Sequence, residues 1–456
     1  MVVVVLAGCG RFHFANQPDA DVADACALGA TCTPAAVCWT GACSSVGCTI
    51  DQPLDQVACP GGTCATGVCT GNASPPFMPN GNNNYFGTSV DSDGQRIVVG
   101  AVLANAAYVL ERTGTTWAVT ATLTSAYGPP QSDFGAGVAI DGDLIVVGSR
   151  YSKGPGQPPA SGTGGAIAIY QRDTGNQWLE IADVLGPDGG EFGGAVDISN
   201  GRIVVGAEYG QTLSNGWGDA YIVEGAGPSW SVVARFDDVA ADRLGHFVQI
   251  SGDRAVIGSL WDPGPSSSET GAVRVWERQP NSTWTLVQKI QPDDPRPDAF
   301  GQGFHLAGDR LAIGVPWFSN SAGGTGAVYI YTRDTATGMW QSPGPILPPV
   351  EQKDGSFGRG IWLDSSRVFA TSIDWASMPS GAVTTSIYRI QPDGTWLEVG
   401  RRIDPGGGDN GFSYGGIECD LQMAGVGDEV VVGFPIRGYT GGQAPGAIVF
   451  EDVTGL

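Results

Sequence analysis

The chain has 456 residues, of which 71 are Gly and 30 are Pro, while 42% are hydrophobic. This apolar content argues against disorder, and frequent Gly and Pro suit many short strands joined by tight turns. The net charge of −23, from 23 basic and 46 acidic residues, excludes the basic footprint that nucleic-acid binding requires. Because no apolar run shows helical spacing, we expect little helix.

The first nine residues end in Leu6-Ala7-Gly8-Cys9. This run resembles the lipobox of bacterial lipoproteins, in which the Cys carries the lipid. We therefore expect export, with Cys9 as the lipid anchor at the outer membrane or cell surface and no other membrane contact. The apolar run before Cys9 is too short for a signal peptide, so we expect the true start to lie upstream. The alternative is an apolar N-terminus that arose by chance.

Residues 10–25 are polar and irregular and are predicted to form a tether, followed by a cysteine-rich module at 26–70. With few large apolar residues, this module needs disulfides, whose pairing the sequence leaves open. Zinc is the alternative, through Cys59 and Cys64, but no His and no C-x-x-C pair accompanies them. Cys419, the remaining cysteine outside this module, is predicted to be a small buried thiol. Residues 71–84 are predicted to form a linker. The module's cysteines are Cys26, Cys32, Cys38, Cys43, Cys48, Cys59, Cys64 and Cys69.

From Tyr85 onward the sequence repeats a Phe-Gly landmark or a near variant of it. The copies begin at Phe86, Phe134, Phe192, Leu244, Phe300 and Phe357, with a degraded seventh copy at 412–415. Insertions that change the spacing of such copies belong in loops. A repeat of this length predicts a solenoid or propeller architecture.

Each landmark opens four strand-like runs, which the second copy shows most clearly. They are 134–140, the continuously apolar 144–148, the alternating 165–170, and 177–181. The fourth run carries a Trp near its start in six copies, namely Trp117, Trp178, Trp230, Trp284, Trp340 and Trp396. Four antiparallel strands cannot bury both faces alone, so we predict an all-β fold over 85–456, a seven-bladed β-propeller of four-stranded blades.

The order Phe-Gly, Val-Val-Gly and Gly-Ala-Val-Tyr-Ile-Tyr331 resembles FG-GAP repeats, the blades of integrin α-subunit heads and of many bacterial surface proteins. The resemblance covers about residues 85–454. Many blades of that kind place a calcium loop between the first two runs. Here the best approximation, Asp91-Ser92-Asp93-Gly94, offers only two carboxylates, whereas calcium needs six to eight oxygens. We therefore expect a plain hairpin turn there, with no metal and no cofactor.

Catalytic motifs are absent from the sequence, and we predict no catalytic residues. His246 and His305 fall on the first run of adjacent copies and are predicted to be satisfied interior histidines. The segment from Asp173 to Trp178 resembles part of the sialidase Asp-box, but Gln171 stands where that box has Ser or Thr. We interpret it as a hairpin turn between the third and fourth runs.

Long, aromatic loops follow the second run of each repeat, and loops held on a rigid scaffold often carry function. We expect them to bind a protein or a glycan. The candidates are Tyr209, Trp217, Trp261, Trp317, Phe318 and Trp375. The alternatives are packing of these side chains into their own blades, a carbohydrate-active hydrolase or lyase, and a purely structural envelope protein. The last repeat lacks a Trp-bearing fourth run, so we expect residues 76–84 to supply part of its outer edge.

Overall fold

The computed structural model describes most of the chain from Tyr85 onward and parts of the segment before it. The described residues are 31–32, 39–44, 47–53, 56, 58–59, 62–65, 68–72, 77, 85–114, 116–128, 131–157, 164–187, 190–211, 217–238, 242–263, 270–292, 299–320, 323–324, 326–342, 344–348, 356–373, 381–408, 412–414, 417–418, 422–426, 429–434 and 447–452.

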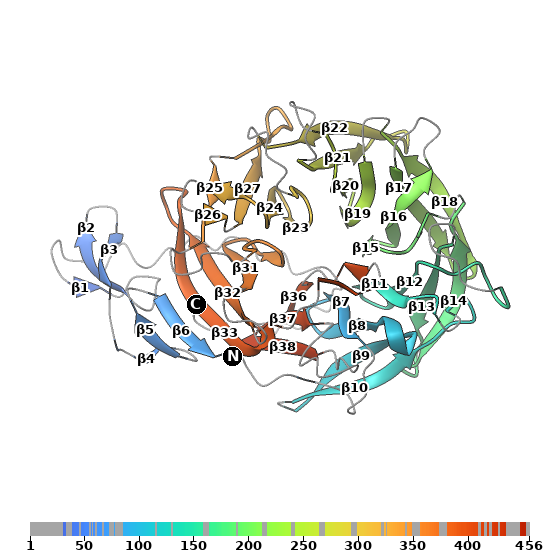
Figure 1. Ribbon diagram of the computed structural model, residues 1–456, viewed down its shortest axis with the longest axis horizontal. Helices are drawn as coiled ribbons and strands as arrows, with labels where there is room; N and C mark the ends of the chain where they lie inside the picture. Colours follow the sequence, from blue (N-terminus) through green and yellow to red (C-terminus); the bar gives the residue numbers. More distant parts are fainter. Residues whose placement is uncertain are drawn as a thin grey trace, which may run out of the picture.

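Antiparallel sheets stand radially around a central axis, which is a β-propeller arrangement (Figure 1). One short 3-10 helix, η1 (Val102–Ala104), interrupts the strands of the described residues. The predicted all-β class is confirmed. No helix among these residues is long and apolar enough to cross a membrane.

Four blades contain four consecutive strands each, numbered from the axis outward. They are β7 (Phe86–Ser92), β8 (Arg96–Ala101), β9 (Ala106–Thr113) and β10 (Thr116–Leu123); β11 (Phe134–Asp141), β12 (Leu144–Ser149), β13 (Ala166–Arg172) and β14 (Trp178–Leu185); β15 (Val196–Ser199), β16 (Arg202–Gln211), β17 (Trp217–Ala226) and β18 (Ser229–Phe236); and β19 (Asp242–Ser251), β20 (Arg254–Ser259), β21 (Ala272–Arg278) and β22 (Trp284–Ile290).

Three further sheets continue around the axis. They contain β23 (Phe304–Ala307), β24 (Arg310–Val315), β27 (Ala327–Arg333), β28 (Trp340–Gln341) and β29 (Pro345–Ile346); β30 (Ile361–Leu363), β31 (Arg367–Ile373), β32 (Gly381–Ile390) and β33 (Trp396–Gly408); and β36 (Met423–Val426), β37 (Glu429–Phe434) and β38 (Ala447–Asp452). Each innermost strand contacts the next, and β36 contacts β7. Two short hairpins, β25 (Ser319–Asn320) with β26 (Gly323–Gly324) and β34 (Phe412–Tyr414) with β35 (Ile417–Glu418), lie outside these sheets.

The central residues of the second strand are apolar because neighbouring sheets cover both of its faces. In β12, Ile145 and Val147 pack into a cluster with Val98 of the first blade. Val146, between them, packs into another cluster with Ile203 of the third blade. All three side chains are fully buried. The continuous apolar runs seen in the sequence are therefore explained by packing between sheets.

The two recurring glycines of the motif meet between neighbouring blades. A Cβ on Gly148 of β12 would lie 1.8 Å from the carbonyl oxygen of Gly193, which is the Gly of the next Phe-Gly landmark and has a φ of 95°. The same contact joins Gly433 to Gly87, with 2.5 Å from the added Cβ to the carbonyl oxygen. Any side chain at these positions would force the blades apart.

An arginine at the start of the second strand holds the next sheet in several blades. Arg254 donates from Nη1 to the Gly308 carbonyl at 2.9 Å and lies 5.2 Å from the ring centroid of Trp340. The same pairs recur as Arg96 with Trp178, Arg202 with Trp284 and Arg310 with Trp396. The Trp at the start of each fourth run therefore serves packing between blades.

The segment before the propeller contains β1 (Thr31–Cys32), β2 (Trp39–Ser44), β3 (Gly47–Pro53), β4 (Ala58–Cys59), β5 (Gly62–Ala65) and β6 (Val68–Asn72). Strand β6 pairs in parallel with β33, so this segment extends the outer edge of the β30 sheet. Cys64 and Cys69 lie opposite each other on β5 and β6, and each is fully buried and takes part in a disulfide. Cys9, Cys26, Cys38 and Cys419 lie outside the described residues.

Strand β6 bears on the expected closure of the last sheet, which has three strands within the described residues. Gly71 and Asn72 pair with β33, on the preceding sheet. Phe77 packs beside Phe86, with 6.2 Å between ring centroids, in a cluster that also contains Val431 of β37. The rest of 76–84 lies outside the described part of the chain, so the closure itself stays a prediction.

Candidate functional site

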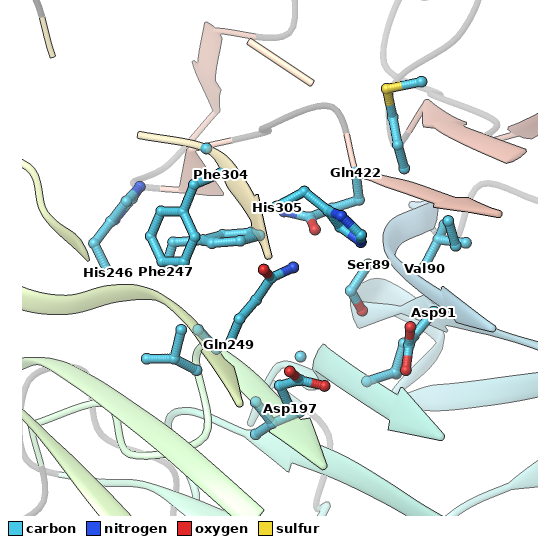
Figure 2. A pocket seen from close by; sticks show the side chains of 18 of the residues that line it. Ser89, Val90, Asp91, Asp197, His246, Phe247, Gln249, Phe304, His305 and Gln422 are labelled. Carbon is cyan, nitrogen blue, oxygen red and sulfur yellow. The ribbon is translucent and has the colours of Figure 1, made fainter. Parts of the chain in front are cut away.

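A cavity of about 200 Å³ lies on the propeller axis. Its walls are formed by the innermost strands β7, β11, β15, β19, β23, β30 and β36, by the residues just before them, and by Arg150 and Glu208. Figure 2 shows that polar side chains from several of these strands, including Asp91, Asp197, Gln249 and His305, gather around this space. The predicted placement of His246 and His305 near the propeller centre is confirmed.

Side chains at one register position connect several innermost strands to the next strand, and we call it the latch position. Its occupants are Asp91, Ala139, Asp197, Gln249, His305, Trp362 and Ala424. The backbone N–H of Ile140 donates to Asp91, that of Ile250 to Asp197 and that of Leu306 to Gln249, each at 2.7 Å. The N–H of Leu363 donates to Nδ1 of His305 at 3.3 Å.

Three latch positions, those of Ala139, Trp362 and Ala424, lack an acceptor, and the contacts at the first two differ. Ala139 cannot reach the N–H of Ile198, which instead donates to Oδ1 of Asp197 at 2.8 Å. Trp362 packs directly on Gly425, where an added Cβ would lie 2.0 Å from the indole. Innermost strands expose N–H groups that no ladder satisfies, and such groups are costly when buried. The polar latch residues are therefore explained first by structure.

Burial also shifts the titration of these groups. Burial, and then the nearby carboxylate of Asp197, raises the pKa of Asp91 well above its ordinary value. Burial lowers the pKa of His305 to about 4, although Asp364 opposes the shift. His305 is thus neutral at pH 7, as its role as a hydrogen-bond acceptor at Nδ1 requires.

A second register position, two residues after the Phe of each landmark, lies at the end of the cavity toward the long loops, and we call it the mouth position. Its occupants are Thr88, Ala136 and Gly194 on one side, and His246, Gln302 and Arg359 on the other. The first three blades thus place small residues here, and the next three sheets place larger side chains that contain N–H groups. Gln302 is 2% exposed and Arg359 is 5% exposed.

A carboxylate–imidazole pair lies at the same end of the cavity. Oε2 of Glu208 is 2.6 Å from Nδ1 of His246 and 4.0 Å from Nη1 of Arg243. Burial alone would raise the pKa of Glu208, but His246, and then Arg243 and Arg150, hold it below its ordinary value. Arg150, also in the cavity wall, pairs with Asp133 at 2.9 Å.

Large apolar side chains recur three residues after the Gly of the second strand, and we call this the rim position. Its described occupants are Leu103, Tyr151, Tyr209, Trp261 and Trp317. Leu103 and Trp317 are each 52% exposed, and Trp261 is half-buried. The guanidinium of Arg243 stacks 3.6 Å from the centroid of Trp261 and 4.9 Å from that of Tyr209.

These placements bear on the predicted ligand residues. Tyr209, Trp261 and Trp317 share the rim position, whereas Phe318 packs partly buried against the hydrophobic cluster of the β23 sheet. Trp217 begins β17 opposite Gln211, and its side chain, like all of Trp375, lies outside the described part of the chain. Ligand binding by these residues stays a prediction.

Sequence reasoning missed Arg243 and the donors at the mouth position. The signal for the donors was present, because His246, Gln302 and Arg359 stand at the same offset from successive landmarks. Arg243 carries no such signal, because its φ of 56° and its place between two rings arise at the folded start of β19. Among the residues described, no group of three or more His, Cys, Asp or Glu is arranged to hold a metal.

The Asp173 segment forms the expected hairpin turn. Oδ1 of Asp173 accepts from the N–H groups of Gly175 and Gln177, both at 2.8 Å. It joins β13 to β14 at the periphery, away from the cavity wall. The interpretation as a structural turn is confirmed by these contacts.

Comparison with known proteins supports the repeat. The FG-GAP repeat matches residues 117–166, so the chain carries an FG-GAP repeat as its motifs predicted. A protein from Lactobacillus plantarum has 13% identity and a TM-score of 0.48 and is covered over 98% of its length by 80% of this chain. The periplasmic gluconolactonase of Pseudomonas aeruginosa has 15% identity and a TM-score of 0.46, over 99% of its chain and 78% of this one.

A streptogramin B lyase is similar at 10% identity and a TM-score of 0.48, over 96% of its chain and 83% of this one. These structures are similar to this chain in fold alone. No curated protein matches the sequence.

Proposed function

We propose that this protein binds a protein or glycan ligand at the rim and mouth of the propeller axis. The observation that carries this proposal is the rim position, where successive blades present Leu103, Tyr151, Tyr209, Trp261 and Trp317 at one register. Exposed aromatic residues are costly in water and are enriched where proteins bind partners or stack on sugar rings. Their arrangement on neighbouring blades supports an extended contact surface.

A glycan and protein array probed with the full chain tests this function. Trp317→Ala should weaken binding of any ligand found by tenfold or more and leave the melting temperature nearly unchanged, because the indole is 52% exposed. Leu179→Ala is the matched control, since Leu179 is also 52% exposed but lies on the outermost strand β14. Equal effects of both substitutions on binding would contradict a rim site.

A carbohydrate-active hydrolase or lyase is the second candidate. It is favoured by the pairing of Glu208 with His246 in a cavity that Arg150 and Arg359 also line. A carboxylate that orients an imidazole is a common general-base arrangement. Incubation with a panel of polysaccharides, with Glu208→Gln as the paired variant, distinguishes the two candidates. Turnover that the variant abolishes would favour the enzyme, and binding without turnover would favour the binding protein.

The wider proposal places this binding protein on the bacterial envelope, anchored through a lipid on Cys9, with a disulfide-rich module at 26–70 and a seven-bladed propeller. Support for seven blades comes from the contacts that join β36 to β7 after six other innermost strands. Support for the anchor comes from Leu6-Ala7-Gly8-Cys9 alone. Metabolic labelling with a palmitate analogue, compared between the chain and Cys9→Ala, tests the anchor.

A further inference from the structure

The cavity mouth is divided into two unlike halves. On β7, β11 and the link before β15, the mouth position carries Thr88, Ala136 and Gly194, which leave space. On β19 and the segments before β23 and β30, it carries His246, Gln302 and Arg359, whose larger side chains contain N–H groups. These equivalent positions leave space on one side of the pocket and place N–H groups on the other. A ligand in the pocket would therefore direct its acceptor group toward the second side.

We propose that His246, Gln302 and Arg359 bind the carboxylate of a sugar acid whose hydroxylated ring occupies the space beside Thr88, Ala136 and Gly194. This inference rests on the proposed function, because the pocket opens onto the same face as the rim. The sugar acid is either a free monosaccharide or the terminal residue of a glycan. Both share one chemistry, a single carboxylate on a hydroxylated ring.

The donors are fixed before any ligand arrives. Gln302 and Arg359 are almost fully enclosed by protein, and a guanidinium has several N–H groups, so it can keep a structural partner while it binds a ligand. Guanidinium groups match carboxylates in a planar, charge-assisted geometry. His246 is oriented through its 2.6 Å contact with Glu208. Little side-chain freedom remains to be lost on binding.

The deeper wall favours hydroxyl groups and disfavours a second anion. Asp91 and Asp197 lie in this wall, and each already accepts a backbone N–H at 2.7 Å. A carboxylate has further lone pairs, so both residues can accept hydrogens from sugar hydroxyls. A wall of acceptor oxygens disfavours a ligand carboxylate and so directs it toward Arg359.

The size of the cavity limits the occupant to one ring. Its volume of about 200 Å³ equals that of roughly seven water molecules at ~30 Å³ each. The remaining residues of a longer glycan would extend out of the cavity and across the rim. Trp261, Arg243, Glu208 and His246 form a continuous series of contacts from rim to cavity, so a terminal sugar acid in the pocket would place the next residues of a glycan near Trp261.

Calorimetry with the full chain tests the proposal without any substitution. The probes are galacturonate, neutral galactose, and a trimer of galacturonate that presents the same acid at a glycan end. We expect galacturonate or the trimer to bind at least tenfold more tightly than galactose. Tighter binding of the monomer identifies a free sugar acid as the ligand, and tighter binding of the trimer identifies a glycan end. Equal affinity for acid and neutral sugar, or no binding of either acid, would overturn the proposal.

Two variants then locate the carboxylate. Arg359→Gln should weaken acid binding by about tenfold or more, as expected for the loss of a charge-assisted hydrogen bond, and leave galactose unaffected. Arg112→Gln removes the same charge from the 44% exposed side chain on β9 and should change nothing. If Arg359→Gln does not fold, Gln302→Met provides the second variant. If Trp317→Ala abolishes binding on the array but calorimetry shows no preference for the acid, the proposed function stands and this inference is overturned.

Discussion

His305 makes the propeller sensitive to acid through one hydrogen bond. Its Nδ1 accepts the N–H of Leu363 and so joins β23 to β30. A protonated imidazole has hydrogens on both nitrogens and can no longer accept. The pKa of His305 is lowered from 6.5 to about 4 by burial in the cavity wall, against the opposing charge of Asp364.

The magnitude follows from this difference in pKa. Between pH 6.5 and 4 the unfolded chain binds a proton at this residue and the folded chain does not, so the free energy of unfolding falls as pH falls. The stabilisation is complete above pH 6.5 and is lost progressively down to pH 4. A difference of about 2.5 pKa units corresponds to about 3 kcal/mol.

His305→Gln isolates this contribution, because Gln249 already performs the same role one blade earlier and does not titrate. We expect His305→Gln to match the natural chain at pH 7 and to exceed its unfolding free energy by 2–3 kcal/mol, an order-of-magnitude figure, near pH 4.5. Urea denaturation at pH 4.5, 5.5, 6.5 and 7.5 measures this. Gln249→Ala is the control and should cost about 1 kcal/mol at every pH. Parallel pH profiles of His305→Gln and the natural chain would refute the reasoning.

Three further predictions concern the scaffold. Arg254→Ala should lower the free energy of unfolding by about 2–3 kcal/mol, because it removes a charged hydrogen bond to Gly308 and the stacking on Trp340. Urea titration measures this, and Arg112→Ala, at an exposed site, should cost less than about 1 kcal/mol in the same titration. Burial, and then Glu180, raises the pKa of Asp183 to about 7, so the folded chain disfavours the charged carboxylate above pH 7. Asp183→Asn removes that charge and should therefore make the chain more stable above pH 7 and not below pH 4. Melting curves at both pH values measure this. Chelation should leave the melting temperature unchanged, because the turn at Asp93 is closed by Arg96 at 2.9 Å, and a fall of many degrees would contradict this.

The repeat and its strands were predictable from sequence because packing between blades imposes the same residues at each copy. Gly148 and Gly193 show this, since each must lack a side chain for the other to approach. The Trp of the fourth run recurs for a similar reason in four copies, where Trp178, Trp284, Trp340 and Trp396 each pair with an arginine from the preceding blade. Local turn chemistry was also readable, as at Asp173.

The cavity was not predictable, because its residues come from positions about 50 residues apart that meet only when the ring of strands forms. The pairing of Glu208 with His246 joins the end of one blade's second strand to the next blade's first strand. The docking of β6 on β33 joins residues more than 300 positions apart. Neither contact produces a local pattern in the sequence. The parallel pairing of β6 with β33 lies outside the repeat, so no periodicity of residues predicts it.

The latch and mouth positions separate the residues that join the innermost strands from those that carry the proposed binding. Latch residues vary between Asp, Gln and His because any acceptor satisfies the N–H of the next strand. Mouth residues differ in another way, with larger side chains that contain N–H groups on three consecutive sheets and small residues on three others. Latch side chains that satisfy backbone N–H groups are explained by their contribution to stability. The difference between the two halves of the mouth position is therefore the feature from which we infer function.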